Sequence, residues 1–383
     1  MSYGKLFRLV IWLTVVIFTV VGCRAVPVAA PVVETPVATS TPVPPTVTPT
    51  PPQQPTSAPQ PAKPTPQPTV ELRAETITSP ALAGNLLGDP AERRVYVLLP
   101  PGYSASEKRY PVVYVMPWGR GYPEDNTWGF KAAMQSLLRK GEIQEMIVVV
   151  PDGTNDLSGG LFLSSPTLGD YEAYVTQDVV NYVDTHYRTL PARDSRGIGG
   201  CSNGGTSSMR LGLKYPNVFS VVAATGGGWD FSPEVLPTDV EEVRRLKELP
   251  TDVRDSGDAI GWWIQLAAGA APDPDNPPFY AEMPVRIVDG QGEFVPEVVA
   301  RIVELDSVHE ARRYLQQPVR LRGVRLQHGT NDSLWAPSIH SFKQVLDDLG
   351  IEHEYVEVNA GHCDGDWEAA SLKYLSDTLV FEE

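Results

Sequence analysis

The chain of 383 residues is short of positive charge and of cysteine, and it lacks several familiar binding motifs. It has 31 Lys and Arg against 47 Asp and Glu, and the resulting net charge of −16 argues against nucleic acid or an anionic membrane surface as a partner. No metal-ligand motif, phosphate loop or dinucleotide fingerprint is found, so we expect no metal and no cofactor. No internal repeat is found either, which argues against a repeat architecture.

An apolar run, Leu9–Val21, follows Lys5 and Arg8 near the N-terminus. This pattern is typical of an export signal, and the run is short for a membrane span, which needs about 20 apolar residues. It ends in Val-Val-Gly-Cys, which resembles a bacterial lipobox. We therefore expect residues 1–22 to be a lipoprotein signal peptide and Cys23 to be lipidated; the alternative is an uncleaved anchor helix. Either way, the rest of the chain is expected outside the cytoplasm, on the outer face of a bacterial membrane.

The next segment, residues 23–70, is expected to be a stalk. Proline fills 15 of the 45 positions from 26 to 70. Because proline fixes φ and removes a backbone donor, no helix or sheet is expected there, and the segment should be extended and semi-rigid. This leaves residues 71–383 for one large catalytic domain.

Apolar strand-like runs alternate with helical patterns through most of this domain. The alternation predicts an α/β fold, with a mostly parallel sheet covered by helices on both faces. The predicted strands are 94–99, 112–116, 146–150, 196–199, 218–224, 324–327 and 354–358, and the predicted helices are 129–140, 171–187, 203–215, 337–349 and 367–379.

Residues 229–318 do not follow this alternation of strands and helices. The segment is far longer than a plain connection, which takes about 2–6 residues. Helical patterns at 239–249, 259–268 and 295–305 indicate an inserted lid before the strand that carries the acid, over the carboxyl ends of the strands. Trp262 and Trp263 are expected either to line a substrate wall or to be buried in the insertion's own core.

Ser202 lies in Gly-Cys-Ser-Asn-Gly-Gly at 200–205, between a predicted strand and a predicted helix. This is the context of a nucleophile elbow, where a strained turn exposes the serine and glycines avoid clashes; the alternative is a structural turn serine. Asp332 and His362 follow downstream. Nucleophile, acid and histidine in this order are typical of α/β-hydrolases, which predicts a Ser-His-Asp triad.

The acid and the histidine are chosen by their places in the predicted fold. Asp332 follows a strand at a polar loop, although an Asp there is often only a turn or capping residue. Its substitutes are Asp306, Asp364 and Asp366. His362 lies between the last strand and the last helix, and the other histidines are expected to be surface or supporting residues: His186, His309, His328, His340 and His353.

Attack by a serine on a carbonyl creates an oxyanion, which needs two backbone donors. One is expected to be the N–H of Asn203, directly after the nucleophile. The other is expected in the loop after the strand 112–116, at Trp118 or Gly119.

Four further motifs carry a resemblance to a known family. They are Leu-Leu-Pro-Pro-Gly-Tyr at 98–103, Tyr-Pro-Val-Val-Tyr-Val at 110–115, Tyr-Arg-Thr at 187–189, and the elbow with Tyr-Pro at 215–216. With them the chain resembles the Putative esterase family, which includes esterase D (S-formylglutathione hydrolase), feruloyl and xylan-acetyl esterase modules, and mycolyltransferases. The resemblance implies an α/β-hydrolase fold and carboxylic-ester chemistry at Ser202, Asp332 and His362. Many members have His-Gly where this chain has Pro117-Trp118-Gly119.

Two of the three cysteines, Cys201 and Cys363, adjoin the predicted nucleophile and the predicted base. If Ser202 and His362 are hydrogen-bonded, these neighbours could lie within the Cα separation of about 4.4–6.8 Å that a disulfide requires, and export permits the bond. The arrangement is similar to that of tannases and fungal feruloyl esterases, where a disulfide joins the two catalytic loops. The alternative is two buried thiols.

The sequence therefore predicts a lipid-anchored serine esterase acting on a small-molecule or carbohydrate-linked ester. One alternative is acyl transfer to a sugar or lipid, as in mycolyltransferases. Another is a surface binding protein on an inactive hydrolase scaffold, against which the complete triad argues.

Overall fold

The structure is a computed structural model that describes residues 69–255 and 257–382. The expected signal peptide, the lipidated Cys23 and nearly all of the expected stalk lie outside these residues. Within the described ranges, no helix has both the length and the apolar character that crossing a membrane requires.

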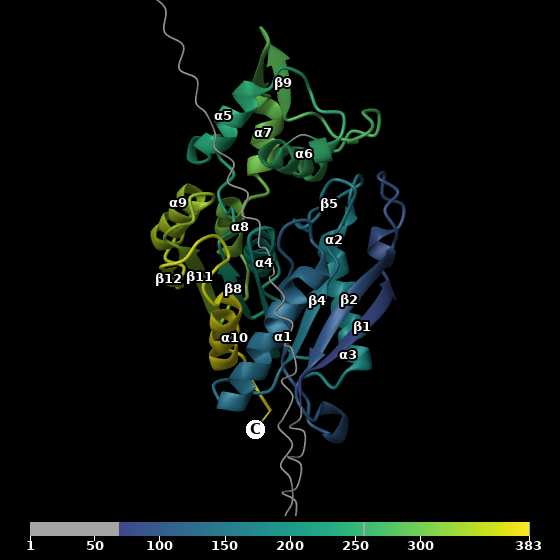
Figure 1. The fold of residues 1–383 in the computed structure, drawn as a ribbon, viewed down its shortest axis with the longest axis vertical. Coiled ribbons are helices and arrows are strands. Elements are labelled where there is room, and N and C mark those ends of the chain that lie inside the picture. The colour runs from purple at the N-terminus through teal and green to yellow at the C-terminus, as the bar shows by residue number, and fades with distance from the viewer. Residues whose placement is uncertain (1–68, 256, 383) are drawn as a thin grey trace, which may run out of the picture. The chain divides into compact units, whose positions relative to one another are not determined.

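An eight-stranded sheet forms the centre of the domain, in the order β1-β2-β4-β3-β7-β8-β11-β12 (Figure 1). Strand β2 runs antiparallel to both β1 and β4, and the other neighbouring strands are parallel. The predicted mostly parallel sheet is confirmed. Its strands are β1 (Glu71–Thr78), β2 (Glu92–Leu99), β3 (Val112–Met116), β4 (Ile147–Pro151), β7 (Arg196–Cys201), β8 (Val221–Thr225), β11 (Gly323–Gly329) and β12 (Glu354–Val358).

Helices cover both faces of the sheet, as predicted. The central strands β3 and β4 are continuous apolar runs that are buried along their whole length, which is typical of strands covered on both sides. One face packs against α1 (Pro123–Lys140) and α10 (Trp367–Thr378), where Phe130 and Trp367 meet edge to face. The opposite face packs against α4 (Asn203–Lys214) and α9 (Ala336–Asp348).

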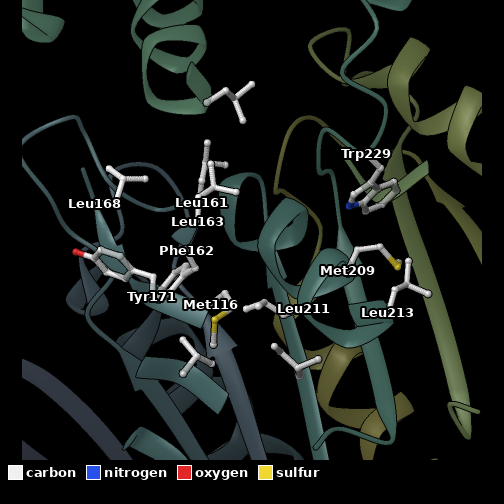
Figure 2. Packing of buried hydrophobic residues seen from close by; sticks show 14 of the residues in the cluster. Met116, Leu161, Phe162, Leu163, Leu168, Tyr171, Met209, Leu211, Leu213 and Trp229 are labelled. Atoms are coloured by element: carbon white, nitrogen blue, oxygen red, sulfur yellow. The ribbon is translucent and has the colours of Figure 1, made fainter. Parts of the chain in front are cut away.

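Helix α4, which follows the predicted nucleophile, is buried over most of its length. Figure 2 shows Met209, Leu211 and Leu213 of this helix, with Met116 from the end of β3 and Trp229 nearby. Arg210, 2% exposed, forms an ion pair with Glu172. A helix that is packed and paired in this way holds its first turn in a fixed position.

Glu172 belongs to a predicted helix, 171–187, that the structure divides into three parts. Helix α2 (Tyr171–Ala173) continues through a π-helical turn (Tyr174–Val179) into α3 (Val180–His186). Before it, the short strands β5 (Ser164–Ser165) and β6 (Gly169–Asp170) form a small hairpin.

The expected insertion contains four α-helices, two short 3₁₀ helices and a hairpin within its described residues. Helix α6 (Asp258–Ala270) contacts the core at several places; for example, Gln265 donates to the carbonyls of Leu157 (2.7 Å) and Gly159 (2.8 Å), and Trp262 packs 5.0 Å from Trp335 between ring centroids. That the insertion acts as a lid stays a prediction. Its elements are α5 (Pro237–Arg245), α6 (Asp258–Ala270), β9 (Val285–Val288), β10 (Gln291–Phe294), α7 (Pro296–Val303) and α8 (Ser307–Tyr314) (Figure 1).

The two tryptophans of the insertion are core residues. Trp263 is fully buried and donates from its indole to Asp239 at 2.9 Å, and Trp262 is 8% exposed. Trp262 packs against Phe231 and Trp263 as well as Trp335. Of the two expectations, burial in the core is the one that the structure shows for both side chains.

Candidate active site

Ser202 occupies a strained turn between β7 and α4. Its φ of 55° and ψ of −126° lie in a region that non-glycine residues rarely adopt. The turn brings α4 so close to β3 that a Cβ at Gly204 would lie 2.0 Å from the carbonyl oxygen of Met116, so this position requires glycine. The Ser202 side chain, on a residue that is only half-buried, is thereby presented at the start of a fixed helix.

His362 and Asp332 meet after β12 and β11. The Nδ1 atom of His362 lies 2.7 Å from Oδ2 of Asp332, and the Asp332 carboxylate is nearly fully buried. The other oxygen, Oδ1, accepts from the N–H of Leu334 at 3.0 Å. The structure thus joins the predicted acid and the predicted base directly.

The charge of Asp332 depends on these partners. Burial opposes ionisation of the carboxyl, but the hydrogen bond and charge of His362 and the backbone N–H groups of Leu334 and Trp335 outweigh burial, so the pKa of Asp332 is lowered. An ionised carboxylate only accepts hydrogen bonds, so Nδ1 of His362 must carry the proton of that bond. Nε2 then keeps a lone pair when the ring is neutral and can act as a base.

The Ser202 and His362 loops are linked covalently. A disulfide joins Cys201 to Cys363, with Cα atoms 5.9 Å apart, and Nε2 of His362 lies 3.7 Å from Sγ of Cys363. Among the described residues, the Ser202 hydroxyl makes no direct hydrogen bond to the His362 ring. Catalytic hydrogen bonds are often long in structures without substrate and tighten only in the substrate complex. The disulfide keeps the two loops that carry Ser202 and His362 next to each other.

Gly226, directly after β8, is a site residue that the sequence reasoning missed. A Cβ there would contact Asp332 Oδ2 at 3.4 Å and both Cys201 Sγ and His362 Nδ1 at 3.5 Å. Its φ is +52°, which favours glycine. The sequence feature that could have identified Gly226 is the Gly-Gly-Gly run at 226–228, which follows a predicted strand. This run adjoins none of the catalytic motifs.

The three expected oxyanion donors differ in their present partners. The N–H of Trp118 donates to Oδ1 of Asn126 at 2.9 Å, so it does not point to an oxyanion. The N–H of Gly119 has no protein acceptor within the ranges 69–255 and 257–382, and that of Asn203 lies in the first turn of α4, where amides have no intrahelical acceptor. The Asn203 side chain donates to the carbonyl of Gly119 at 2.8 Å, which holds the two loops together.

The substitutes for the acid lie elsewhere or have other tasks. Asp306 caps α8 and accepts from the backbone and the ring of His309. Burial raises the pKa of Asp306 to about 6 despite those bonds. Asp364 and Asp366 lie in the turn before α10 and, within the described part of the chain, make no hydrogen bond or ion pair with the ring of His362, whose Nδ1 faces Asp332.

A polar cavity of about 450 Å³ opens beside the loop after β3. Arg120 and Tyr122 of that loop line it together with residues 154–158 and residues 278–280 of the insertion. Trp118 and Tyr122 are large aromatic residues that are 40% and 50% exposed. The arrangement offers aromatic faces and polar groups next to the expected oxyanion donors.

Comparisons with known proteins identify the family of the chain. The model of the Putative esterase family matches residues 90–373. An esterase of Mycobacterium tuberculosis is 23% identical over 273 residues, which are 70% of this chain and 52% of that protein. An endo-1,4-beta-xylanase/feruloyl esterase of Xylanibacter ruminicola is 27% identical over 180 residues, which are 43% of this chain and 24% of that protein. The chain thus spans about half the length, or less, of these curated relatives.

Solved structures resemble the chain over most of its length. A ferulic acid esterase has a TM-score of 0.55 at 18% identity and covers 82% of this chain and 100% of its own. The fluorophosphonate-binding serine hydrolase F of Staphylococcus aureus has a TM-score of 0.53 at 12% identity and covers 81% of this chain and 98% of its own. These likenesses confirm the predicted α/β-hydrolase fold.

Proposed function

The chain belongs to the Putative esterase family, and from that premise we propose that it is an extracytoplasmic serine esterase that hydrolyses a carboxylic ester through Ser202, His362 and Asp332. The observation that carries the proposal is the bond of 2.7 Å between His362 and Asp332, in a loop tethered by a disulfide to the residue before Ser202. Family membership supports ester chemistry, and the geometry supports these three residues.

In the first half of the reaction, the Ser202 hydroxyl attacks the ester carbonyl. Nε2 of His362 takes the hydroxyl proton as the new C–O bond forms, because a neutral serine is a poor nucleophile. Asp332 stabilises the imidazolium and holds its orientation. The oxyanion accepts hydrogen bonds from the backbone N–H groups of Asn203 and Gly119. The bond from the Asn203 side chain to the Gly119 carbonyl holds the Gly119 loop in place.

In the second half, the C–O bond to the alcohol breaks and His362 returns its proton to the departing oxygen. Ser202 then holds the acyl group as an ester. A water molecule gives a proton to Nε2 and attacks that acyl-enzyme. As the acid is released, His362 passes this proton to the Ser202 oxygen, which restores the serine. Atoms balance: one ester and one water become one acid and one alcohol.

The surroundings of the site favour an ester that carries a ring. Trp118 and Tyr122 are exposed aromatic residues, and flat apolar rings pack well against such side chains. The cavity lined by Arg120 and Tyr122 adds polar partners for a hydroxylated group. We propose a phenolic or carbohydrate-linked ester as the substrate class.

The disulfide also supports export. Structural disulfides persist in oxidising compartments and are rare in the cytosol. Together with the lipobox-like sequence before Cys23, this supports a lipid anchor at the cell envelope. Growth of producing cells with an alkyne-tagged fatty acid tests the anchor; the wild type should incorporate the label, the Cys23→Ala variant should not, and a wild type without label would contradict lipidation.

A substrate panel tests the proposed activity. Para-nitrophenyl esters of increasing chain length, methyl ferulate and acetylated xylan are incubated with the full chain, with Ser202→Ala as the control, and the products are separated with and without an added alcohol. Free acid formed by the wild type alone supports the hydrolase. New esters of the added alcohol in place of acid indicate an acyltransferase, and no product from any ester contradicts the proposal.

A further inference from the structure

Three side chains that take no part in the proposed reaction converge beside the acid loop. They are His328 at the end of β11, His340 on α9 and Glu357 near the end of β12. One ligand atom from each residue lies within 4.8 Å of those of the other two. His328 and Glu357 are direct partners in the parallel register of β11 and β12, so their side chains leave the same face of the sheet. The rings of His328 and His340 pack edge to face, with centroids 5.2 Å apart.

His328 has the hydrogen-bonding pattern of a metal ligand. The residue is 3% exposed, and its Nε2 lies 3.4 Å from the backbone carbonyl of Asp332. A carbonyl only accepts, so this contact assigns the ring proton to Nε2 and leaves a lone pair on Nδ1. Among the described residues, Nδ1 is buried without a hydrogen-bond partner. Metal-binding histidines characteristically donate their second ring N–H to a backbone carbonyl in this way, which fixes the tautomer.

The other two side chains are free to close around an ion. Nε2 of His340 lies 3.8 Å from Oε1 of Glu357, and the two side chains are 56% and 50% exposed. Oε1 of Glu357 also accepts from the Tyr355 hydroxyl at 2.9 Å, which leaves Oε2 available. Zinc binds nitrogen and oxygen at about 2.0–2.2 Å, so its ligand atoms lie about 3.3 Å apart. Rotation of two surface side chains can supply the difference.

We propose that His328, His340 and Glu357 form a binding site for a divalent transition-metal ion of the Zn²⁺ class. Two imidazoles and one carboxylate suit Zn²⁺, Co²⁺, Ni²⁺ and Cu²⁺, whereas Mg²⁺ and Ca²⁺ prefer ligand sets made of oxygen. Three protein ligands leave the fourth tetrahedral position to water.

The position of the site indicates what the ion does. His328 precedes the loop that holds Asp332, His340 follows it on α9, and Glu357 lies on the strand that leads to His362. An ion bound by all three therefore cross-links the segments that carry the acid and the histidine. Because the unfolded chain does not hold these ligands together, binding stabilises the folded state.

The test uses the full chain without a polyhistidine tag, freed of metal by a chelator and then titrated with Zn²⁺ in a calorimeter. Saturable binding of one ion per chain is expected, with a thermal midpoint raised by about 5 °C at about 100 times the Kd. His340→Gln and Glu357→Gln should each raise the Kd by about tenfold or more. The matched control is His186→Gln, an exposed histidine on α3, which should leave the Kd unchanged.

Two further measurements make the outcome decisive. Co²⁺ in place of Zn²⁺ should give the visible absorption of a tetrahedral site in the wild type and lose it in Glu357→Gln. The thermal midpoints of the metal-free variants, expected to match the wild type, show that the variants fold. Absence of saturable binding by Zn²⁺, or a Kd that neither His340→Gln nor Glu357→Gln changes, would overturn the proposal. Equal stabilisation by Mg²⁺ would overturn the assigned class of ion.

Discussion

The Cα atoms of Cys201 and Cys363 lie 5.9 Å apart and a disulfide joins their side chains, so the neighbours of Ser202 and His362 form one covalent unit. The bond links positions that are 162 residues apart in sequence. A tether across so long a segment limits how far the histidine loop can move from the nucleophile, in the folded and the unfolded chain alike.

Loss of the disulfide should therefore weaken both stability and catalysis. The Cys201→Ala/Cys363→Ala variant should lose about 3–5 kcal/mol in free energy of unfolding, measured in urea. Its kcat should fall about tenfold or more, because the histidine loop is less closely placed. A reductant should have similar effects on the wild type and none on the double variant. Free alkylation of both thiols in the unreduced, denatured wild type would contradict the bond itself.

Replacing Asp332 with asparagine should keep the shape of the site and remove the charge. The amide cannot stabilise the imidazolium and favours the wrong tautomer of His362, so kcat should fall about 10⁴-fold with KM little changed. Steady-state kinetics on a para-nitrophenyl ester measure both constants. The control is Asp364→Asn in the neighbouring turn, which should stay close to the wild type. Comparable losses in the two variants would argue against Asp332 as the partner of the histidine.

Removing the Asn203 side chain should loosen the loop that carries Gly119. The amide of Asn203 donates to the Gly119 carbonyl at 2.8 Å, and Asn203→Ala loses this bond while keeping its own backbone N–H. We expect kcat to fall about tenfold and KM to stay within about twofold, because the loss affects the transition state more than the bound ester. Asn181→Ala, at an exposed position on α3, serves as the control. An unchanged kcat would remove Gly119 from the proposed oxyanion donors.

Low pH should weaken the ion pair between Glu172 and Arg210 of α4, the helix that follows Ser202. Burial of Glu172 opposes its ionisation, but Arg210 and Lys214 outweigh burial and the pKa is lowered to about 2. Because a carboxyl titrates at about 4.3 in the unfolded chain, the pair contributes stability above that pH, and the contribution, about 3 kcal/mol, is lost as pH falls towards 2.

The Glu172→Gln variant isolates this effect. At pH 7 it should be less stable than the wild type by about 3–5 kcal/mol, since Arg210 is left buried without its partner. Urea unfolding of both proteins from pH 7 down to 3 gives the difference at each pH. The difference should shrink below about pH 4; a difference that is constant with pH would contradict the assigned ionisation.

Much of the fold follows from local sequence patterns. The apolar run 112–116 predicted β3, and the β-rich run 354–358 predicted β12, both with the bounds that the structure has. Strand β1 was missed, because Glu-Leu-Arg-Ala-Glu-Thr-Ile-Thr is an edge strand with few buried side chains. The β9–β10 hairpin was also missed, although Asp289-Gly290, both with positive φ, is a typical hairpin turn.

Site residues could be predicted from the sequence where a short motif determines the local geometry. The glycine-rich turn and the chain order identified Ser202, Asp332 and His362 as candidates, and the structure joins the latter two. The bond from the Trp118 N–H to Asn126 could not be predicted, since it depends on how α1 packs. The same holds for the metal ligands: His328, His340 and Glu357 come from three elements and form no sequence motif.

Covalent labelling tests the central claim most directly. A fluorophosphonate probe should attach to the full chain, and peptide mass spectrometry should find the adduct on Ser202 alone. Ser202→Ala should abolish labelling, and His362→Ala should slow it by about 10³-fold or more while leaving the fold intact. Labelling that persists in Ser202→Ala, or an adduct on a different residue of the wild type, would contradict the assignment of Ser202 as the nucleophile.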